Sequence, residues 1–394
     1  MLSLRKTVAI ALLCNVYVLI SPVVHAYVPI SLVSLALSFY IIAVSAFVSG
    51  GLKFNRGIIA QIFFVLLPFI VSGFFWEEPT LVAYPKFLIL SIIVVSLMDQ
   101  RTHILFIKYS TFFLYFQCFL AIVGFFYAAM GGGPIAEVTI GWGRTFSLYL
   151  TSFSVTNYVG FIRPSGTFDE PGALSFFICF IASLREIYQQ NRGSTLVLLV
   201  LGFITLSLAH AIFVLIYLVH VAIFLKYWKT LFIVVTLTIL AIFMLNSLIS
   251  ENFLFNYVMS RLTSDINGGR GTLLSNAYEI IKSDGILVYI FGIDSNCLTD
   301  YIEKCRYVYP AMGENYLSLI AFAGLLPAWT YYFYTVLILV LLFLAPRMAL
   351  PLFALSVLFW QRPVVFMIGY SFVFAYLMFE ITRLFKKRSV DGVL

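Results

Sequence analysis

Apolar residues along this chain fall into long blocks that short polar segments interrupt. Most blocks are long enough to cross a hydrocarbon core of roughly 30 Å as a single helix. The pattern predicts about twelve transmembrane helices, at residues 7–25, 28–49, 57–75, 80–98, 104–130, 171–188, 194–208, 210–225, 230–249, 316–344, 348–360 and 363–383. We therefore expect an all-α integral membrane protein that forms one polytopic domain over residues 1–394.

Two of these apolar stretches are too long for one helix. We expect the stretch 194–225 to break at "TLSLAHA". We expect the stretch 316–344 to begin as a short interfacial helix before "GLLP", where glycine and proline interrupt the pattern.

The composition agrees with a membrane protein. Mean hydropathy is +1.03 and 10% of residues are charged, whereas a soluble domain carries about 25% charged residues. The N-terminal "MLSLRKTVAIALLCNVYVLI" has the basic start and apolar run of a signal peptide as well as of a first transmembrane helix. We favour the helix because no small-x-small cleavage site closes the run.

Basic residues in the short loops predict the orientation. With the N-terminus inside, the inside segments hold Arg5, Lys6, Lys53, Arg56, Arg101, Arg185, Arg192, Lys226, Lys229, Arg347 and the tail "RLFKKR". The short outside loops "HAY", "WEEPT" and "QRP" hold almost none. Both termini are therefore expected in the cytoplasm. The net charge of +7 reflects this anchoring bias and does not indicate a nucleic-acid partner.

Two long outside segments contain most of the polar chemistry. They are residues 131–170, the first outside loop, and residues 250–315, the second outside loop, and we expect short helices in both. All acidic residues except Asp99, Glu186, Glu380 and Asp391 fall outside in this topology. In the second loop, Cys297 and Cys305 flank "LTDYIEK", and an oxidising compartment predicts a disulfide between them.

The first outside loop ends in "RPSGTFDEPGALSFF", residues 163–177. Pro171 suits the first turn of the following helix, and Asp169 and Glu170 then lie at its positive N-terminus. Helix capping alone would explain the two acids. Capping does not explain Arg163, and charges at a membrane are kept when they pair or function.

The second outside loop contains "NGGRG", which places Arg270 among glycines just ahead of a predicted helix. Glycines allow successive backbone N–H groups to face one concavity that binds anions, and arginine adds a bidentate fork for phosphate oxygens. The competing interpretation is a flexible turn with a solvated arginine. Further along, Glu314 beside Asn315 is either a general base or an N-terminal helix charge.

Three further residues are weaker candidates for glycan contacts. Trp142 and Arg144 lie in "GWGR", where the indole either stacks on a sugar or anchors the loop at the interface. His210 lies at the outside turn of "TLSLAHAIF", and packing is a better interpretation of it than catalysis. We find no metal-ligand pattern and expect neither a metal nor another cofactor.

Together these features resemble the O-antigen polymerases of the Wzy type, which share a membrane glycosyltransferase superfamily with the O-antigen ligases. The resemblance covers the topology, an R-x-x-G-x-F-x-E-P element here "RPSGTFDEP", an arginine ahead of a helix here "GGRGTLLSNAYEIIKSDGILVYIFGID", and a return element here "ENYLSLIAFAGL". It implies that Arg163 and Arg270 bind the pyrophosphate of a lipid-linked donor. The ligases have a catalytic histidine where this chain has Glu314, a difference that favours a polymerase.

The resemblance implies a GT-C-like bundle in a bacterial inner membrane with its active site in the periplasm. The enzyme would join undecaprenyl-pyrophosphate-linked repeat units into O-antigen or capsular polysaccharide without a metal, with Glu314 or Glu170 as base and Asp169 and Asn315 near the glycan. A chain-length regulator and a flippase of the same pathway are the expected partners. The alternatives are a ligase that transfers glycan to lipid A–core and a flippase or other transporter; spans almost free of charge, apart from Lys86 and Lys108, argue against transport.

Overall fold

A computed structural model describes residues 2–51, 56–77, 82–140, 144–154, 157–158, 161–225, 236, 270–283, 285–292, 315–361 and 364–390. Within this part, five helices are long and apolar enough to cross a membrane: α1 with η1 (Leu2–Ile20), α3 (Ile30–Ser49), α4 (Arg56–Phe75), α6 (Gln100–Ala129) and α16 (Leu325–Leu344). The other helices are α2 (Pro22–Tyr27), α5 (Lys86–Leu97), α7 (Pro171–Ile187), α8 (Arg192–Gly202), η3 (Phe203–Thr205), α9 (Leu208–Leu225), α12 (Arg270–Ser283), α13 (Gly285–Phe291), α15 (Ser318–Ala323), α17 (Pro346–Gln361) and α18 (Tyr370–Val390).

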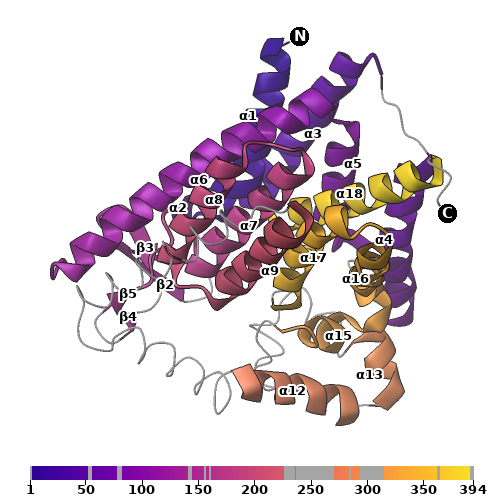
Figure 1. Cartoon of the computed structure of the whole chain (residues 1–394). Coiled ribbons are helices and arrows are strands. Elements are labelled where there is room, and N and C mark those ends of the chain that lie inside the picture. Colours follow the sequence, from indigo (N-terminus) through magenta and orange to yellow (C-terminus); the bar gives the residue numbers. More distant parts are fainter. Residues whose placement is uncertain are drawn as a thin grey trace.

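The chain is thus a mostly helical protein with several helices suited to a membrane (Figure 1). Twelve spans stay a prediction, because the expected span 230–249 lies outside the described residues apart from Thr236.

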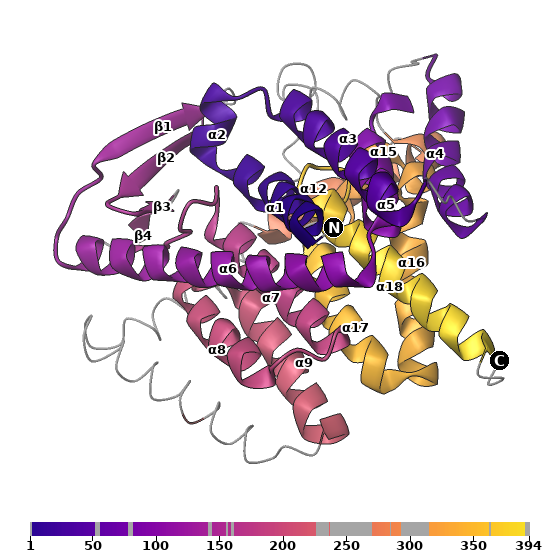
Figure 2. The ribbon, with the colours of Figure 1, turned by 90° about the horizontal axis from the view of Figure 1, so that it is seen from above.

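Helix α7 forms the centre of the bundle. All of its residues except Gly172 and Glu186 are buried, and α6, α8, α9 and α17 pack around it (Figure 2). A helix that is apolar on every face is stable only when neighbours cover every face. Both ends of α7 are therefore held inside the fold and cannot move independently of it.

The two overlong stretches break where the sequence predicts. Between η3 and α9, Leu206 adopts a left-handed conformation with φ of 50°. Gly202 ends α8 beside the His210 ring, and a Cβ there would lie 2.4 Å from the ring carbon Cε1. The second break falls at Gly324, between α15 and α16, where φ is 77°.

The first outside loop differs from the prediction. In its described residues it contains strands and no helix: β1 (Ala136–Ile140), β2 (Arg144–Tyr149) and β3 (Ser152–Ser154) form an antiparallel sheet, and β4 (Asn157–Tyr158) pairs with β5 (Phe161–Ile162). Strand β3 lies against the C-terminal half of α6, where a Cβ on Gly124 would stand 2.5 Å from the Ser152 Cβ. This close approach lets the sheet rest directly on the helix.

The second outside loop does contain helices in its described part. Ala277 and Ile280 of α12 and Ala321 of α15 form a small apolar core. At the end of α13, a Cβ on Gly292 would lie 2.2 Å from the Phe322 carbonyl oxygen, and a Cβ on Gly324 would lie 2.3 Å from the Ile290 carbonyl oxygen. The two backbones therefore touch, and glycine is required on both sides.

Contacts between turns agree with the predicted alternation of inside and outside. Arg5 pairs with Asp99 at 2.7 Å, which joins two predicted inside segments. The Trp76 indole N–H donates to the Phe291 carbonyl at 3.2 Å, which joins two predicted outside segments. Each of these two contacts joins segments that the sequence places on the same side. Which side faces the cytoplasm stays a prediction from the basic residues.

Candidate functional site

The loop element 163–171 runs from strand β5 to the start of α7 and is fixed against strand β3. The Ser152 hydroxyl oxygen accepts hydrogen bonds from the backbone N–H groups of Ser165 at 3.1 Å and Gly166 at 2.9 Å. The Phe153 N–H donates to the Gly166 carbonyl at 2.8 Å, and the Ser165 N–H donates to the Phe153 carbonyl at 3.0 Å. The element is therefore tied down by its backbone.

A second attachment comes from the middle of α6. The buried Gln117 side-chain oxygen accepts from the N–H of Thr167 at 2.8 Å and from its hydroxyl at 3.1 Å. Gly166 has φ of 61°, and a Cβ there would lie 2.6 Å from the same Gln117 oxygen. Only glycine allows both this conformation and this close approach.

Phe168 anchors the element in the core. Its ring is 1% exposed, stacks on Phe177 with centroids 5.6 Å apart, and meets Tyr17 edge-on at 6.4 Å. The Ser165 hydroxyl donates to the Phe168 carbonyl at 2.7 Å. Because the anchor is a large buried ring, the residues on either side of it occupy fixed positions.

Pro171 is the first residue of α7, as the sequence predicts. Glu170 precedes it with extended backbone, and its carbonyl accepts from the N–H groups of Ala173 at 3.0 Å and Leu174 at 3.2 Å. Within the described part of the chain, the Glu170 side chain does not cap α7. Capping by this carboxylate therefore does not explain its position, although its negative charge still lies at the positive helix end.

Arg163 reaches across to another part of the bundle. Its guanidinium Nη2 lies 3.5 Å from the carbonyl oxygen of Leu206, in the turn between η3 and α9, and its side chain is partly buried. The arginine thus stands between the first outside loop and the α8–α9 turn, on the same loop element as Asp169 and Glu170. An arginine and two carboxylates on one loop element are the residue types that bind a phosphate and accept a proton.

His210 is enclosed by its neighbours. It is fully buried, its Nε2 lies 2.8 Å from the Leu199 carbonyl oxygen, and its Nδ1 lies 3.4 Å from the Cys179 sulfur. The carbonyl requires that Nε2 carry the proton, so Nδ1 is left to accept from the thiol. This geometry favours the packing interpretation, and a glycan contact by His210 stays a prediction that the arrangement does not support.

The second-loop candidates are described only in part. Arg270 is the first residue of α12, so the helix begins at this arginine and not, as the sequence predicted, just after it; its side chain lies outside the described residues. Asn315 Oδ1 accepts from the N–H groups of Leu317 and Ser318, each at 3.0 Å, and its Nδ2 lies 3.4 Å from the Leu273 carbonyl oxygen. Asn315 thus connects α12 to the turn that opens α15, and its proposed glycan contact is untested.

The remaining predicted residues cannot be placed. Trp142, Glu314, Cys297 and Cys305 lie outside the described residues, as does the side chain of Arg144, whose backbone begins β2. Of the predicted site residues, Arg163, Asp169 and Glu170 thus share one loop element whose backbone is fixed between strand β3 and helix α6. The expected approach of Arg163 to Arg270 stays a prediction.

Sequence reasoning missed the two residues that hold the loop element, Gln117 and Ser152. Gln117 carried a usable signal, because an amide in the middle of the apolar block "LYFQCFLA" needs a partner. Ser152 carried none, since serines are common in loops.

The site therefore combines a cation and two carboxylates on a loop whose backbone is fixed by α6, β3 and the aromatic core. Comparisons with protein-family models, with curated proteins and with solved structures find no match for this chain.

Proposed function

We propose that this chain is a polymerase that joins lipid-pyrophosphate-linked oligosaccharide repeat units into O-antigen or capsular polysaccharide. The observation that carries the proposal is the loop element 163–171. It is held by Ser152, Gln117 and Phe168, while the Glu170 side chain is not used to cap α7 within the described residues. A rigid loop that presents an arginine and two acids suits a site that binds an anion and moves a proton.

The reaction follows from the chemistry of the donor. A hydroxyl oxygen of the acceptor repeat unit forms a bond to the anomeric carbon of the donor glycan. The bond from that carbon to the pyrophosphate oxygen breaks, and the lipid pyrophosphate leaves with the electron pair. The hydroxyl proton passes to a carboxylate, for which Glu170 and Glu314 are the candidates. Arg163 and Arg270 stabilise the charge that develops on the leaving group.

The proposed substrates also account for a site between membrane helices. Donor and acceptor both carry a long prenyl chain, which stays in the lipid while the sugars and the pyrophosphate reach the outside loops. The proposed location is a bacterial inner membrane with the site in the periplasm. A flippase would supply the repeat units, and a chain-length regulator would limit the product.

The test uses Arg163→Ala and Arg270→Ala in cells that depend on this chain for their polysaccharide. We expect surface glycan of single-repeat length, with the protein still inserted in the membrane. Lys282→Ala is the matched control, because Lys282 is exposed on α12 and carries the same charge on the same predicted face. Normal long-chain polymer in both arginine variants would overturn the proposal.

Deletion of the gene separates a polymerase from a ligase. Cells without a polymerase keep glycan of one repeat on lipid A–core, whereas cells without a ligase lose this glycan.

Transport is the second candidate function, because the helices contain buried charge beyond the two residues that the sequence argument against transport named. That argument named Lys86 and Lys108, but Glu380 in α18 is fully buried, with its carboxylate 2.7 Å from Arg383. Buried charges in membrane helices often mark transport paths. If the chain were a flippase, Glu380→Gln would abolish all surface glycan, including the single-repeat form. A polymerase with this substitution would still produce glycan.

A further inference from the structure

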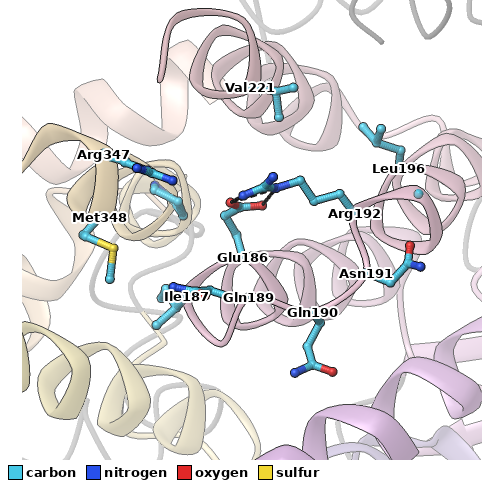
Figure 3. Close-up of a pocket in the computed structure, with 12 residues that line it drawn as sticks. Glu186, Ile187, Gln189, Gln190, Asn191, Arg192, Leu196, Val221, Arg347 and Met348 are labelled. Carbon is cyan, nitrogen blue, oxygen red and sulfur yellow. Dashed lines mark hydrogen bonds and ion pairs between the residues drawn. The ribbon is translucent and has the colours of Figure 1, made fainter. Parts of the chain in front are cut away.

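A cavity of about 860 Å³ lies at the C-terminal end of α7, opposite the end that carries the loop element. Its walls come from the last turn of α7 and the turn after it, the first two turns of α8, the C-terminal part of α9 and the first turns of α17 (Figure 3). Ligand cavities in proteins are typically roughly 300–1,000 Å³. The space is therefore large enough for an organic ligand and much larger than a water molecule or a simple ion needs.

The polar lining of the cavity is positively charged overall. Arg192 holds the Glu186 carboxylate with three hydrogen bonds of 3.1–3.2 Å. On its buried side, Glu186 also accepts from the Tyr217 hydroxyl at 3.1 Å. The charge of Glu186 is therefore balanced within the wall by Arg192.

Arg347 supplies the positive charge that remains. It lies on the first turn of α17 and forms no ion pair with any described residue. Figure 3 shows its guanidinium facing the same space as the Glu186–Arg192 pair. An unpaired arginine on a cavity wall attracts an anion, and its planar fork matches phosphate oxygens.

The rest of the lining divides into two kinds. Gln189, Gln190 and Asn191 offer neutral polar groups, while Leu196, Val221 and Met348 offer apolar surface. A free phosphate would contact only the polar residues of the lining. A phospholipid would contact both kinds, because its phosphate and hydroxyls bind polar groups and its first methylenes pack against apolar ones. Basic pockets between the ends of membrane helices are known to bind lipid head groups.

We propose that this cavity binds the head group of an anionic phospholipid, with Arg347 contacting the phosphate. The Arg192–Glu186 pair forms the floor of the site, and Gln189 lies in the wall beside this pair. This inference is independent of the polymerase proposal and concerns the opposite end of α7.

The test is native mass spectrometry of the full-length chain, purified in detergent and mixed with equal amounts of phosphatidylglycerol and phosphatidylethanolamine. We expect the wild-type chain to retain phosphatidylglycerol preferentially. Arg347→Gln should weaken that binding about tenfold, the value of one charge-assisted contact, and Arg347→Lys should weaken it less. Arg101→Gln is the control, because it removes an exposed arginine on the same predicted face without touching the cavity.

Three results would overturn the proposal. The first is equal retention of phosphatidylglycerol by the wild-type chain and Arg347→Gln, and the second is equal retention of both lipids by the wild-type chain. The third is full displacement of phosphatidylglycerol by inorganic phosphate at the same concentration, which would assign the cavity to a free anion. Size-exclusion profiles show whether each variant is folded, and surface glycan length reports separately on the polymerase proposal.

Discussion

The two ends of α7 both carry arginine and acidic residues, but they use them differently. At the start, the Ser152 and Gln117 side-chain oxygens accept hydrogen bonds from the loop element and the Ser165 hydroxyl donates within it. The Glu170 side chain does not cap the helix within the described residues. At the other end, the charged side chains themselves hold the structure. The sequence shows arginine and acid at both places, so charge alone does not separate a functional end from a structural one.

Arg185 shows how the structural end works. Its guanidinium donates to the Thr195 hydroxyl at 2.8 Å, the Thr111 hydroxyl at 3.0 Å and the Asn191 carbonyl at 2.8 Å, and it also contacts the Ser194 hydroxyl. One side chain thus joins α6, α7 and the start of α8. Because the guanidinium N–H groups of Arg185 already donate to these oxygens inside the fold, they are not available to bind a substrate.

The largest effect that tests this comparison is expected from Arg185→Ala. It leaves several buried oxygens without their charged donor, which should cost about 3 kcal/mol or more. We expect little folded protein in membranes and a clearly lower thermal midpoint in detergent. Arg101→Ala, which alters an exposed arginine, should change neither. A folded and stable Arg185→Ala protein would remove the distinction between the two ends.

Glu170→Gln tests the start of α7, where we propose that the reaction takes place. If Glu170 is the base, the polymerisation rate should fall at least about a hundredfold. Stability should change by less than about 1 kcal/mol, because glutamine keeps the size of the side chain and removes the negative charge at the helix end. Polymer length in cells and thermal unfolding of the purified protein measure the two quantities. Full activity in this variant would exclude Glu170 and leave Glu314 as the candidate base.

Gly166→Ala tests whether the loop element must be rigid. The new Cβ meets the Gln117 oxygen at 2.6 Å in a left-handed backbone, so we expect a loss of about 2 kcal/mol together with reduced polymer length. Gly133→Ala is the control, because nothing lies within 4 Å of that position. If both alanine variants behave alike, the close contact with α6 is not what fixes the loop.

The smallest effect concerns Asp99, an acid that does cap a helix. Its Oδ1 accepts from the Thr102 N–H at 2.9 Å, and its Oδ2 pairs with Arg5. Partial burial raises the pKa of Asp99, but the bonds from Thr102 and Arg5 outweigh it and hold the pKa below its usual value. A lowered carboxyl pKa contributes stability above the ordinary pKa of about 3.9 and loses it as pH falls through the lower folded value.

Thermal unfolding between pH 6 and pH 3 should therefore show a small acid-dependent loss that is absent from Asp99→Asn. The loss should be below about 1 kcal/mol, because the ion pair is partly exposed. The same pH dependence in the wild-type chain and in Asp99→Asn would show that the Asp99 carboxylate does not stabilise the fold in this way. Asp99 would then no longer serve as the capping acid with which Glu170 is contrasted.

The sequence predicted those parts of the fold that local chemistry decides. Pro171 marks the start of α7, and the breaks at Leu206 and Gly324 follow from segments too long for one helix. The strands of the first outside loop were missed because they are short: β1 has five residues and β2 has six. Such short segments do not show an alternation of apolar and polar residues that is long enough to predict a strand. Gln117 and Ser152 could not be assigned, since their role depends on contacts between segments 14 to 50 residues apart.

The contact between Gly292 and Gly324 has a consequence for how such a chain can change over generations. Residues 293–314 lie outside the described part, but the residues before and after them are fixed against each other by this contact and by the bond from Asn315 to Leu273. The distance between Gly292 and Asn315, which residues 293–314 connect, is thus set by the packing of the neighbouring helices. Changes of length between Gly292 and Asn315 therefore leave the packing of α12, α13 and α15 in place as long as the inserted chain still joins these two fixed points.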